Sequence, residues 1–159
     1  MGQPKLVVFD LDFTLWDCGG LWVDCADFPF QGGENGRVTD SSGRPLRLYD
    51  EVPLILKQLE AEGIPMGLAS RTSQPSWARD LLKLLGISEC FEYQEIFPGS
   101  KVAHFENLAA ASDLHYSEML FFDDEHRNVH EVGRMGVHCV EVNSGISMDV
   151  FESGLDLFL

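Results

Sequence analysis

Basic residues are scarce in this sequence. It holds 11 lysine and arginine residues against 26 aspartate and glutamate residues, which gives a formal net charge of −15. A chain with this charge repels the phosphate backbone of nucleic acids and anionic membrane surfaces. We therefore expect no nucleic-acid partner and no membrane partner.

Paired cysteines, metal-binding histidine patterns and long apolar runs are also missing. The four cysteines form no C-x-x-C pair, and among the histidines only His126 and His130 have a shared spacing, which alone does not make a zinc site. No apolar stretch approaches the roughly 20 residues needed to span a bilayer. The N-terminus lacks a basic segment followed by an apolar signal region. We expect reduced thiols and a cytoplasmic protein.

Internal repeats and low-complexity segments are absent as well. The chain has 159 residues and 45% hydrophobic content, which is enough for one globular domain with a substantial core. We expect residues 1–159 to form a single domain that does not require oligomerisation.

Strands and helices alternate along the sequence. Apolar runs predict strands over residues 6–9, 65–69, 93–97, 119–122 and 137–142. Helical spacing predicts helices over residues 50–62 with Asp50 as N-cap, from Pro75 to Gly86, from about Lys101 onwards, and near 128–135. This order predicts an α/β fold, a Rossmann-like parallel sheet in three layers with helices on both faces.

Residues 16–49 interrupt the alternation. They are rich in glycine and in turn signals such as Asn35-Gly36, with short apolar pieces between them. The pattern predicts a short flap or hairpin insertion over the site. For residues 32–45 a surface loop is an equal alternative.

Two pairs of acids stand at the ends of predicted strands. Asp10 and Asp12 follow the strand over 6–9, and Asp123 and Asp124 follow the strand over 119–122. In a parallel sheet these ends meet at one edge, where ligands bind. Clustered carboxylates repel one another and are costly to bury unless a cation neutralises them. Ligation by oxygen alone suits Mg²⁺, so the sequence predicts a magnesium site.

The segment Asp10-Leu11-Asp12-Phe13-Thr14 resembles the D-x-D-x-T signature of the haloacid dehalogenase-like (HAD) phosphohydrolases. The rest of the pattern follows in the family's order, with Ser70 at a strand end, Lys101 at a helix start and the acid pair 123–124 before Asn128. The likeness extends over nearly the whole chain.

The resemblance is closer to the magnesium-dependent phosphatase-1 branch of that superfamily. The segments that carry it are residues 9–16, 69–72, 98–101 and 121–125. It implies the core fold with a short flap in place of a large cap. It also implies Mg²⁺-dependent phosphatase activity toward phosphotyrosine or sugar phosphates.

Roles for the acids follow from chemistry and from this resemblance. Asp10 is the predicted nucleophile, which forms an aspartyl phosphate and also contacts Mg²⁺. Asp12 is the predicted acid and base, and the resemblance places its main-chain carbonyl on the metal. Asp124 is a further predicted metal ligand, whereas Asp123 is expected to orient the site without binding the metal itself.

The phosphate oxygens require donors. We expect these from the main chain at Leu11, the Ser70 hydroxyl, the Arg71 guanidinium and the Lys101 ammonium. A lysine at a helix N-terminus opposes the helix dipole and usually needs an anionic partner.

The remaining candidates surround the predicted nucleophile. Trp16 and Trp22 are placed either to stack on a sugar or phenyl leaving group or to pack within the flap, and Trp22 is the better candidate for substrate contact. Thr14 and Asn128 are expected to brace loops, and Trp77 is expected in the core.

The predicted function is a Mg²⁺-dependent phosphomonoesterase acting on protein phosphotyrosine or on a sugar phosphate. Its partner is then a phosphorylated small molecule or a phosphoprotein. A phosphotransferase or mutase on the same scaffold is the main alternative. A receiver-type signalling domain is disfavoured because it carries its paired acids on the first strand, whereas here the Asp-Asp pair follows a late strand. A Ca²⁺-binding module is disfavoured because no D-x-[DN]-x-[DN]-G run is present.

Overall fold

A five-stranded parallel sheet forms the centre of the protein in the computed structural model, which describes residues 2–159. Its strands are β1 (Leu6–Phe9), β6 (Met66–Ser70), β7 (Tyr93–Ile96), β8 (Met119–Asp123) and β9 (His138–Glu141), in the order β7-β6-β1-β8-β9. In the register, Phe9 of the central strand β1 pairs with Leu68 on one side and Phe122 on the other. The predicted parallel α/β sheet is confirmed.

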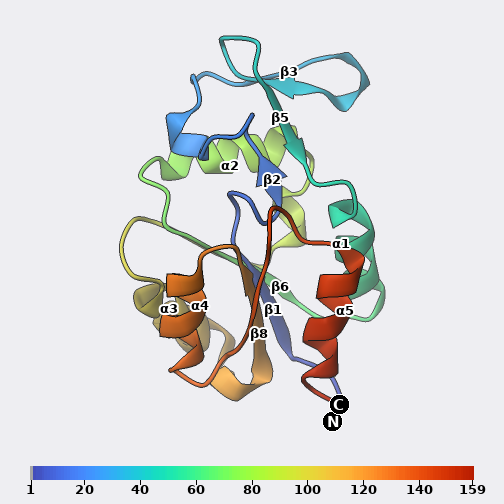
Figure 1. Ribbon diagram of the computed structural model, residues 1–159, viewed down its shortest axis with the longest axis vertical. Helices are drawn as coiled ribbons and strands as arrows, with labels where there is room; N and C mark the ends of the chain where they lie inside the picture. Colours follow the sequence, from blue (N-terminus) through green and yellow to red (C-terminus); the bar gives the residue numbers. More distant parts are fainter. Residues whose placement is uncertain (1) are drawn as a thin grey trace.

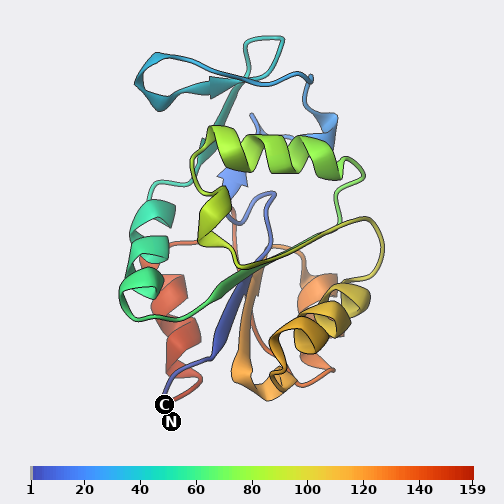
Figure 2. The same ribbon diagram turned by 180° about the vertical axis from the view of Figure 1, so that it is seen from behind.

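Helices cover both faces of this sheet (Figures 1 and 2). One face carries α1 (Val52–Ala61), α2 (Pro75–Leu84) and α5 (Met148–Asp156), and the other carries α3 (Lys101–Ser112) and α4 (His126–Gly133). Successive side chains of a strand point to opposite faces. Val7 and Phe9 therefore join the core on the α1 side, and Leu6 and Val8 join the core on the α3 side. The three-layer prediction is confirmed.

Some element boundaries differ from the predictions. Helix α1 has Glu51 as N-cap rather than Asp50, and no side chain caps it. The Glu51 carboxylate instead accepts the Met148 N–H at 3.1 Å, which links the starts of α1 and α5. Helix α5 was not predicted. Its N-cap is Ser147, whose side chain accepts the Val150 N–H.

Residues 16–49, here called the flap segment, form a second sheet at the end of the molecule beyond the strand ends (Figure 1). Its strands are β2 (Trp16–Asp17), β3 (Gln31–Gly32), β4 (Val38–Thr39) and β5 (Pro45–Leu48), all antiparallel, in the order β2-β5-β4-β3. Short 3₁₀ turns complete the chain: η1 (Val23–Cys25), η2 (Glu34–Gly36), η3 (Ser88–Cys90) and η4 (Tyr116–Glu118).

Aromatic rings join the flap segment to α2. The Phe28 ring stacks on Trp77 with centroids 5.0 Å apart, and Phe30 meets the same indole edge-on. Trp77 was expected in the core. It is half-buried and packs against the edge of the core on the α1 side.

The cysteines in the described chain are free: Cys18, Cys25, Cys90 and Cys139. Across residues 2–159, no helix combines the length and apolar character needed to cross a bilayer.

Candidate active site

A tight turn after β1 places Asp10 and Asp12 at the carboxyl edge of the sheet. The Leu11 carbonyl accepts main-chain N–H groups from three following residues, Thr14, Leu15 and Trp16. Phe13 adopts a φ of 63°, in the left-handed region, and donates its N–H to the Trp16 carbonyl. The chain thus doubles back and brings Trp16 beside Asp12.

Two N–H groups hold the carboxylate of Asp12. The Trp16 indole Nε1 donates to Oδ1 at 2.8 Å, and the Val23 main-chain N–H donates to the same oxygen at 2.9 Å. Burial raises the pKa of Asp12 to about 7, although the Trp16 hydrogen bond acts in the opposite direction. A carboxyl group with a pKa near neutrality is suited to both giving and taking a proton.

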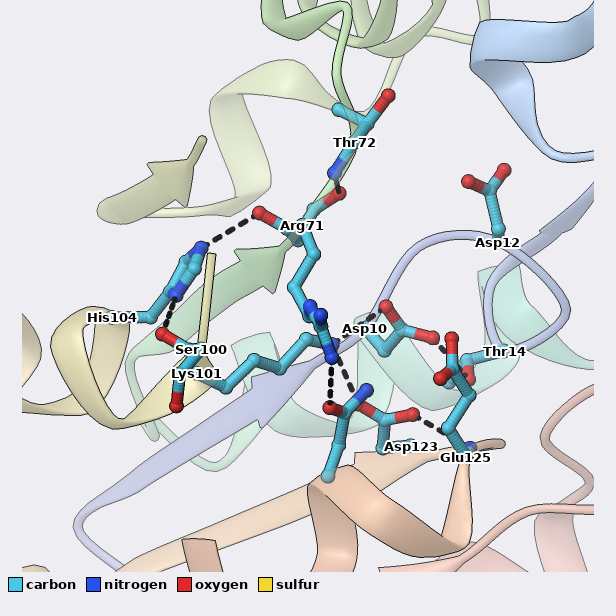
Figure 3. Close-up of polar contacts among 12 residues, drawn as sticks. Asp10, Asp12, Thr14, Arg71, Thr72, Ser100, Lys101, His104, Asp123 and Glu125 are labelled. Atoms are coloured by element: carbon cyan, nitrogen blue, oxygen red, sulfur yellow. Dashed lines mark hydrogen bonds and ion pairs between the residues drawn. The ribbon is translucent and has the colours of Figure 1, made fainter. Parts of the chain in front are cut away.

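Lys101 connects the two acid pairs (Figure 3). It is the first residue of α3 and only 1% exposed, and its Nζ donates to Asp10 Oδ1 at 2.8 Å and to Asp123 Oδ2 at 2.5 Å. Burial alone lowers the pKa of the ammonium, but the charges of Asp10 and Asp123 hold it above the usual value. The anionic partner expected for a lysine at this position is therefore a pair of carboxylates.

Asp123 has partners on both carboxylate oxygens. Oδ2 accepts Asn128 Nδ2 at 3.1 Å in addition to Lys101, and Oδ1 accepts the Glu125 main-chain N–H at 2.8 Å. Burial, with the charge of Asp10, raises the pKa of Asp123 to about 7. These bonds suit a residue that orients its neighbours.

Asp124 lies one residue beyond β8, so the alternation of the strand does not separate it from Asp123. One carboxylate oxygen each of Asp10, Asp123 and Asp124 lies within 4.8 Å of the others. Burial raises the pKa of Asp124 to about 9, and the hydrogen bond and charge of Asp10 add to this.

This donor set fits Mg²⁺. The cluster consists of carboxylate oxygens, the ligands that a hard divalent cation prefers, and their mutual repulsion shows in the raised pKa of Asp124. The Asp123 carboxylate accepts three hydrogen bonds and the Asp10 carboxylate accepts two, so Asp10 and Asp124 are better placed than Asp123 to offer a ligand atom.

Polar donors approach from β6 and α4. Ser70 is the last residue of β6 and is buried, and its Oγ accepts the Thr72 N–H at 3.3 Å. Arg71 donates from its guanidinium to Asn128 Oδ1 at 3.1 Å. Since Asn128 also donates to Asp123, this amide connects the arginine to the acid pair.

Seven of the predicted residues meet in one pocket of about 260 Å³. It is lined by Asp10, Asp12, Trp22, Ser70, Arg71, Lys101 and Asn128, and also by Asp24, Thr72, Glu125 and Arg127. The lining does not include four other predicted residues, Leu11, Thr14, Asp123 and Asp124. Thr14 lies behind Asp10 and donates from Oγ1 to Asp10 Oδ2 at 3.2 Å. The sequence therefore identified most of the lining residues.

The two tryptophans that follow Asp10 in the sequence, Trp16 and Trp22, differ in position. Trp22 is 54% exposed and lines the pocket, as the substrate-contact alternative requires. Trp16 is fully buried and bonds Asp12, so the packing alternative holds for it.

Sequence reasoning missed several residues of this region. Asp24 accepts the N–H and hydroxyl of Ser73, which ties the flap segment to the loop after β6. Arg127 stands one residue before Asn128 at the start of α4, where the helical pattern gives no sign of a pocket. His104 is buried beside Ser70 and Ser100, and no ligand spacing marks it in the sequence.

Comparison with known proteins places this site in a family. Residues 2–159 match the family model described as acid phosphatase. The chain belongs to the acid phosphatase family. The predicted phosphatase class is thereby confirmed.

A curated relative and two solved structures agree with this assignment. The chain is 44% identical to magnesium-dependent phosphatase 1 of Homo sapiens over 156 residues, which is 98% of this chain and 87% of the relative. A HAD-superfamily hydrolase from Ehrlichia chaffeensis superimposes with a TM-score of 0.70 at 14% identity, over 99% of this chain and 97% of that one. The phosphatase-containing N-terminal part of a Bacteroides fragilis protein, complexed with Mg, superimposes with a TM-score of 0.71 at 16% identity, over 99% of this chain and 41% of that one. The predicted resemblance to the magnesium-dependent phosphatase-1 branch is confirmed, and the predicted Mg²⁺ cofactor agrees with the names of two of these proteins.

Proposed function

We propose that this protein is a Mg²⁺-dependent phosphomonoesterase that hydrolyses its substrate through an aspartyl phosphate, an acyl phosphate formed on Asp10. The observation that carries the proposal is the joint placement of Asp10 and Asp12 on one pocket that also receives Lys101 and Arg71. One carboxylate is bonded to a cation and the other is held by neutral N–H groups with a raised pKa. Two carboxylates in such different surroundings are suited to different tasks.

The first task is nucleophilic attack by Asp10. One carboxylate oxygen forms a bond to phosphorus while the bond from phosphorus to the leaving oxygen breaks. Lys101 and Thr14 fix this carboxylate, with Lys101 Nζ at 2.8 Å from Oδ1 and Thr14 Oγ1 at 3.2 Å from Oδ2. Attack requires two anions to approach, so the positive side chains lining the pocket lower its cost.

The second task is proton transfer by Asp12. Its proton passes to the leaving oxygen as the substrate bond breaks, and the free carboxylate then takes a proton from the water that attacks phosphorus. The bond between phosphorus and Asp10 breaks in that step, which releases inorganic phosphate and restores both acids. Trp16 and Val23 both bind Oδ1, so Oδ2 is left to face the reacting atoms.

Asp10, Asp124 and the main-chain carbonyl of Asp12 would hold the Mg²⁺. When bound, the ion neutralises the clustered carboxylates and offsets the charge of the phosphoryl oxygens. The Leu11 main chain, Ser70, Arg71 and Lys101 supply the other contacts to these oxygens in this proposal.

The substrate is a phosphotyrosine side chain of a protein or a sugar phosphate. A pocket of about 260 Å³ has room for part of the organic group beside the phosphoryl group, since a cavity of about 150 Å³ already admits a benzene ring, and the exposed Trp22 lines it. An exposed indole offers a flat apolar surface to a phenyl or sugar ring. The cytoplasmic location and the absence of a required partner chain stay predictions.

The test is phosphate release from a panel of phosphotyrosine peptides and sugar phosphates, with Mg²⁺ and with chelator. Asp10→Asn is the blank, and Asp80→Asn on α2, outside the pocket lining, is the matched control. We expect chelator-sensitive release by the wild type and by Asp80→Asn from one class of substrate. Transfer of the phosphoryl group to an added alcohol in place of water would instead support the phosphotransferase alternative. Release that survives chelator or Asp10→Asn would overturn the mechanism.

A further inference from the structure

His104 occupies an unusual place next to the phosphate-binding residues. It lies on α3 three residues after Lys101 and is fully buried. Its Nδ1 lies 3.1 Å from the Ser100 carbonyl oxygen (Figure 3). Its Nε2 lies 2.8 Å from the Ser70 carbonyl oxygen and 2.8 Å from that of Phe97. The ring also stacks on Phe97, with centroids 3.9 Å apart and planes 6° from parallel.

These contacts determine where the imidazole carries its proton. A carbonyl oxygen only accepts, so the nitrogen that faces two of them must be a donor. Nδ1 faces one carbonyl oxygen at 3.1 Å and Nε2 faces two at 2.8 Å, so a neutral ring satisfies more of these contacts with its hydrogen on Nε2. Burial lowers the pKa of His104, and the charge of Lys101 acts in the same direction, which favours the neutral ring with its hydrogen on Nε2.

The three carbonyls belong to segments that are distant in the sequence but adjacent at the pocket. Ser70 ends β6, Phe97 follows β7, and Ser100 is the N-cap of the helix that begins with Lys101. The Ser70 carbonyl also accepts the Phe97 N–H at 3.1 Å. The imidazole thus connects the segment that presents the Ser70 hydroxyl with the segment that presents the Lys101 ammonium.

We propose that His104 is a positioning residue for phosphate binding, because its Nε2–H joins the Ser70 and Phe97 carbonyls and so sets Ser70 and Lys101 at the spacing that a phosphoryl group requires. The inference rests on the proposed roles of Ser70 and Lys101 in the site. His104 acts through those two residues and does not itself line the pocket. The hydrogen bonds of its ring go to main-chain carbonyls and not to the predicted metal ligands, and Lys101 alone links it to Asp10, so its loss should act on phosphate more than on Mg²⁺.

The experiment compares His104→Leu, which removes the donor, with His104→Gln, whose amide can donate to the same carbonyls. Leu108→Ala is the matched control, since Leu108 is fully buried on the same helix and its truncation destabilises α3 without touching Ser70 or Lys101. The readouts are KM, kcat, the inhibition constant of inorganic phosphate and the Mg²⁺ concentration for half-maximal activity. Binding of inorganic phosphate to the Mg²⁺-loaded protein is also measured by calorimetry, which needs no turnover.

We expect His104→Leu to weaken phosphate binding and raise KM by about tenfold, the factor that corresponds to one ordinary hydrogen bond. The Mg²⁺ concentration for half-maximal activity should change much less than the phosphate affinity, and His104→Gln should recover most of the loss. Wild-type phosphate affinity in His104→Leu, or equal losses in His104→Leu, His104→Gln and Leu108→Ala, would overturn the proposal. A wild-type protein that binds phosphate but hydrolyses no ester would refute the proposed function and leave this comparison valid.

A second measurement covers the case in which His104→Leu does not fold. Nitrogen NMR of the wild-type imidazole reports which ring nitrogen carries hydrogen. We expect the hydrogen on Nε2 in the free and the phosphate-bound protein. A ring with its hydrogen on Nδ1 alone would refute the inference, because Nε2 would then face two carbonyls as an acceptor.

Discussion

Trp16→Phe tests whether the flap segment orients the catalytic acid. The substitution keeps a buried aromatic ring but removes the indole N–H that donates to Asp12 Oδ1 at 2.8 Å. The Val23 N–H at 2.9 Å remains, so the carboxylate keeps one of its two donors. A hydrogen bond to a charged group contributes about 1.5–3 kcal/mol, which sets the upper limit of the effect on the barrier at roughly 10- to 150-fold in rate.

The assay uses two substrates that differ in their need for an acid. An aryl phosphate with a good leaving group departs with little protonation, whereas an alkyl phosphate needs a proton on its leaving oxygen. We expect Trp16→Phe to lower kcat/KM for the alkyl phosphate by about 10-fold or more and to change the value for the aryl phosphate much less.

Trp77→Phe is the control, since Trp77 also packs against the flap segment but does not line the pocket. It should affect both substrates equally and weakly. Equal losses for both substrates in Trp16→Phe, or no loss, would refute the reasoning that this indole positions Asp12.

Four further outcomes follow from the charges and packing of the site region. Mg²⁺ at 100 times its dissociation constant should raise the melting temperature by about 5–10 °C at pH 8. The rise should be smaller at pH 5.5, because protons compete with Mg²⁺ for Asp124, and Asp124→Asn should remove most of the rise. In the metal-free protein the pKa of Asp124 is raised from 3.8 to about 9, so between these pH values the folded state binds a proton that the unfolded state does not. Stability should therefore fall as the pH rises from about 4 to about 9, and thermal scans without Mg²⁺ measure this. Lys101→Met leaves two buried carboxylates without their cation and should cost about 3–5 kcal/mol in urea unfolding of the metal-free protein, whereas a cost near zero would show that the ion pair is not needed. Gly154→Ala places a Cβ at 2.6 Å from the Phe122 ring and should lower the free energy of unfolding by about 1–3 kcal/mol, with the Mg²⁺ affinity unchanged. An unchanged free energy of urea unfolding would contradict the packing of α5 on β8.

The strands of the main sheet could be predicted because each is a short buried run with a clear boundary. β1 is four consecutive buried apolar residues, and β8 is five buried residues that end in the first acid of the pair. Helix α5 could not be predicted with the same ease, because its nine residues include Ser153 and Gly154, which are weak helix formers. It is held by the Ser147 cap and by packing of Phe151 and Gly154 against the sheet, which are tertiary effects.

The site was predictable to the extent that it lies at strand ends and helix starts. Parallel topology alone brings Asp10, Ser70 and Asp123 to one edge of the sheet. Lys101 begins α3, the helix that follows β7. The donors to Asp12 come from the flap segment, whose path is set by contacts such as Phe28 on Trp77 and Asp24 on Ser73. No local pattern encodes those contacts, and His104 was missed for the same reason.

Chemical quench of the reaction tests the central claim most directly. The Mg²⁺-loaded protein is mixed with a labelled phosphate ester, stopped in acid within one turnover and digested. The account predicts label on the peptide that contains Asp10, sensitive to hydroxylamine as an acyl phosphate is, and no label on Asp10→Asn. Label on a different residue, or full turnover with no labelled peptide at any time, would contradict it.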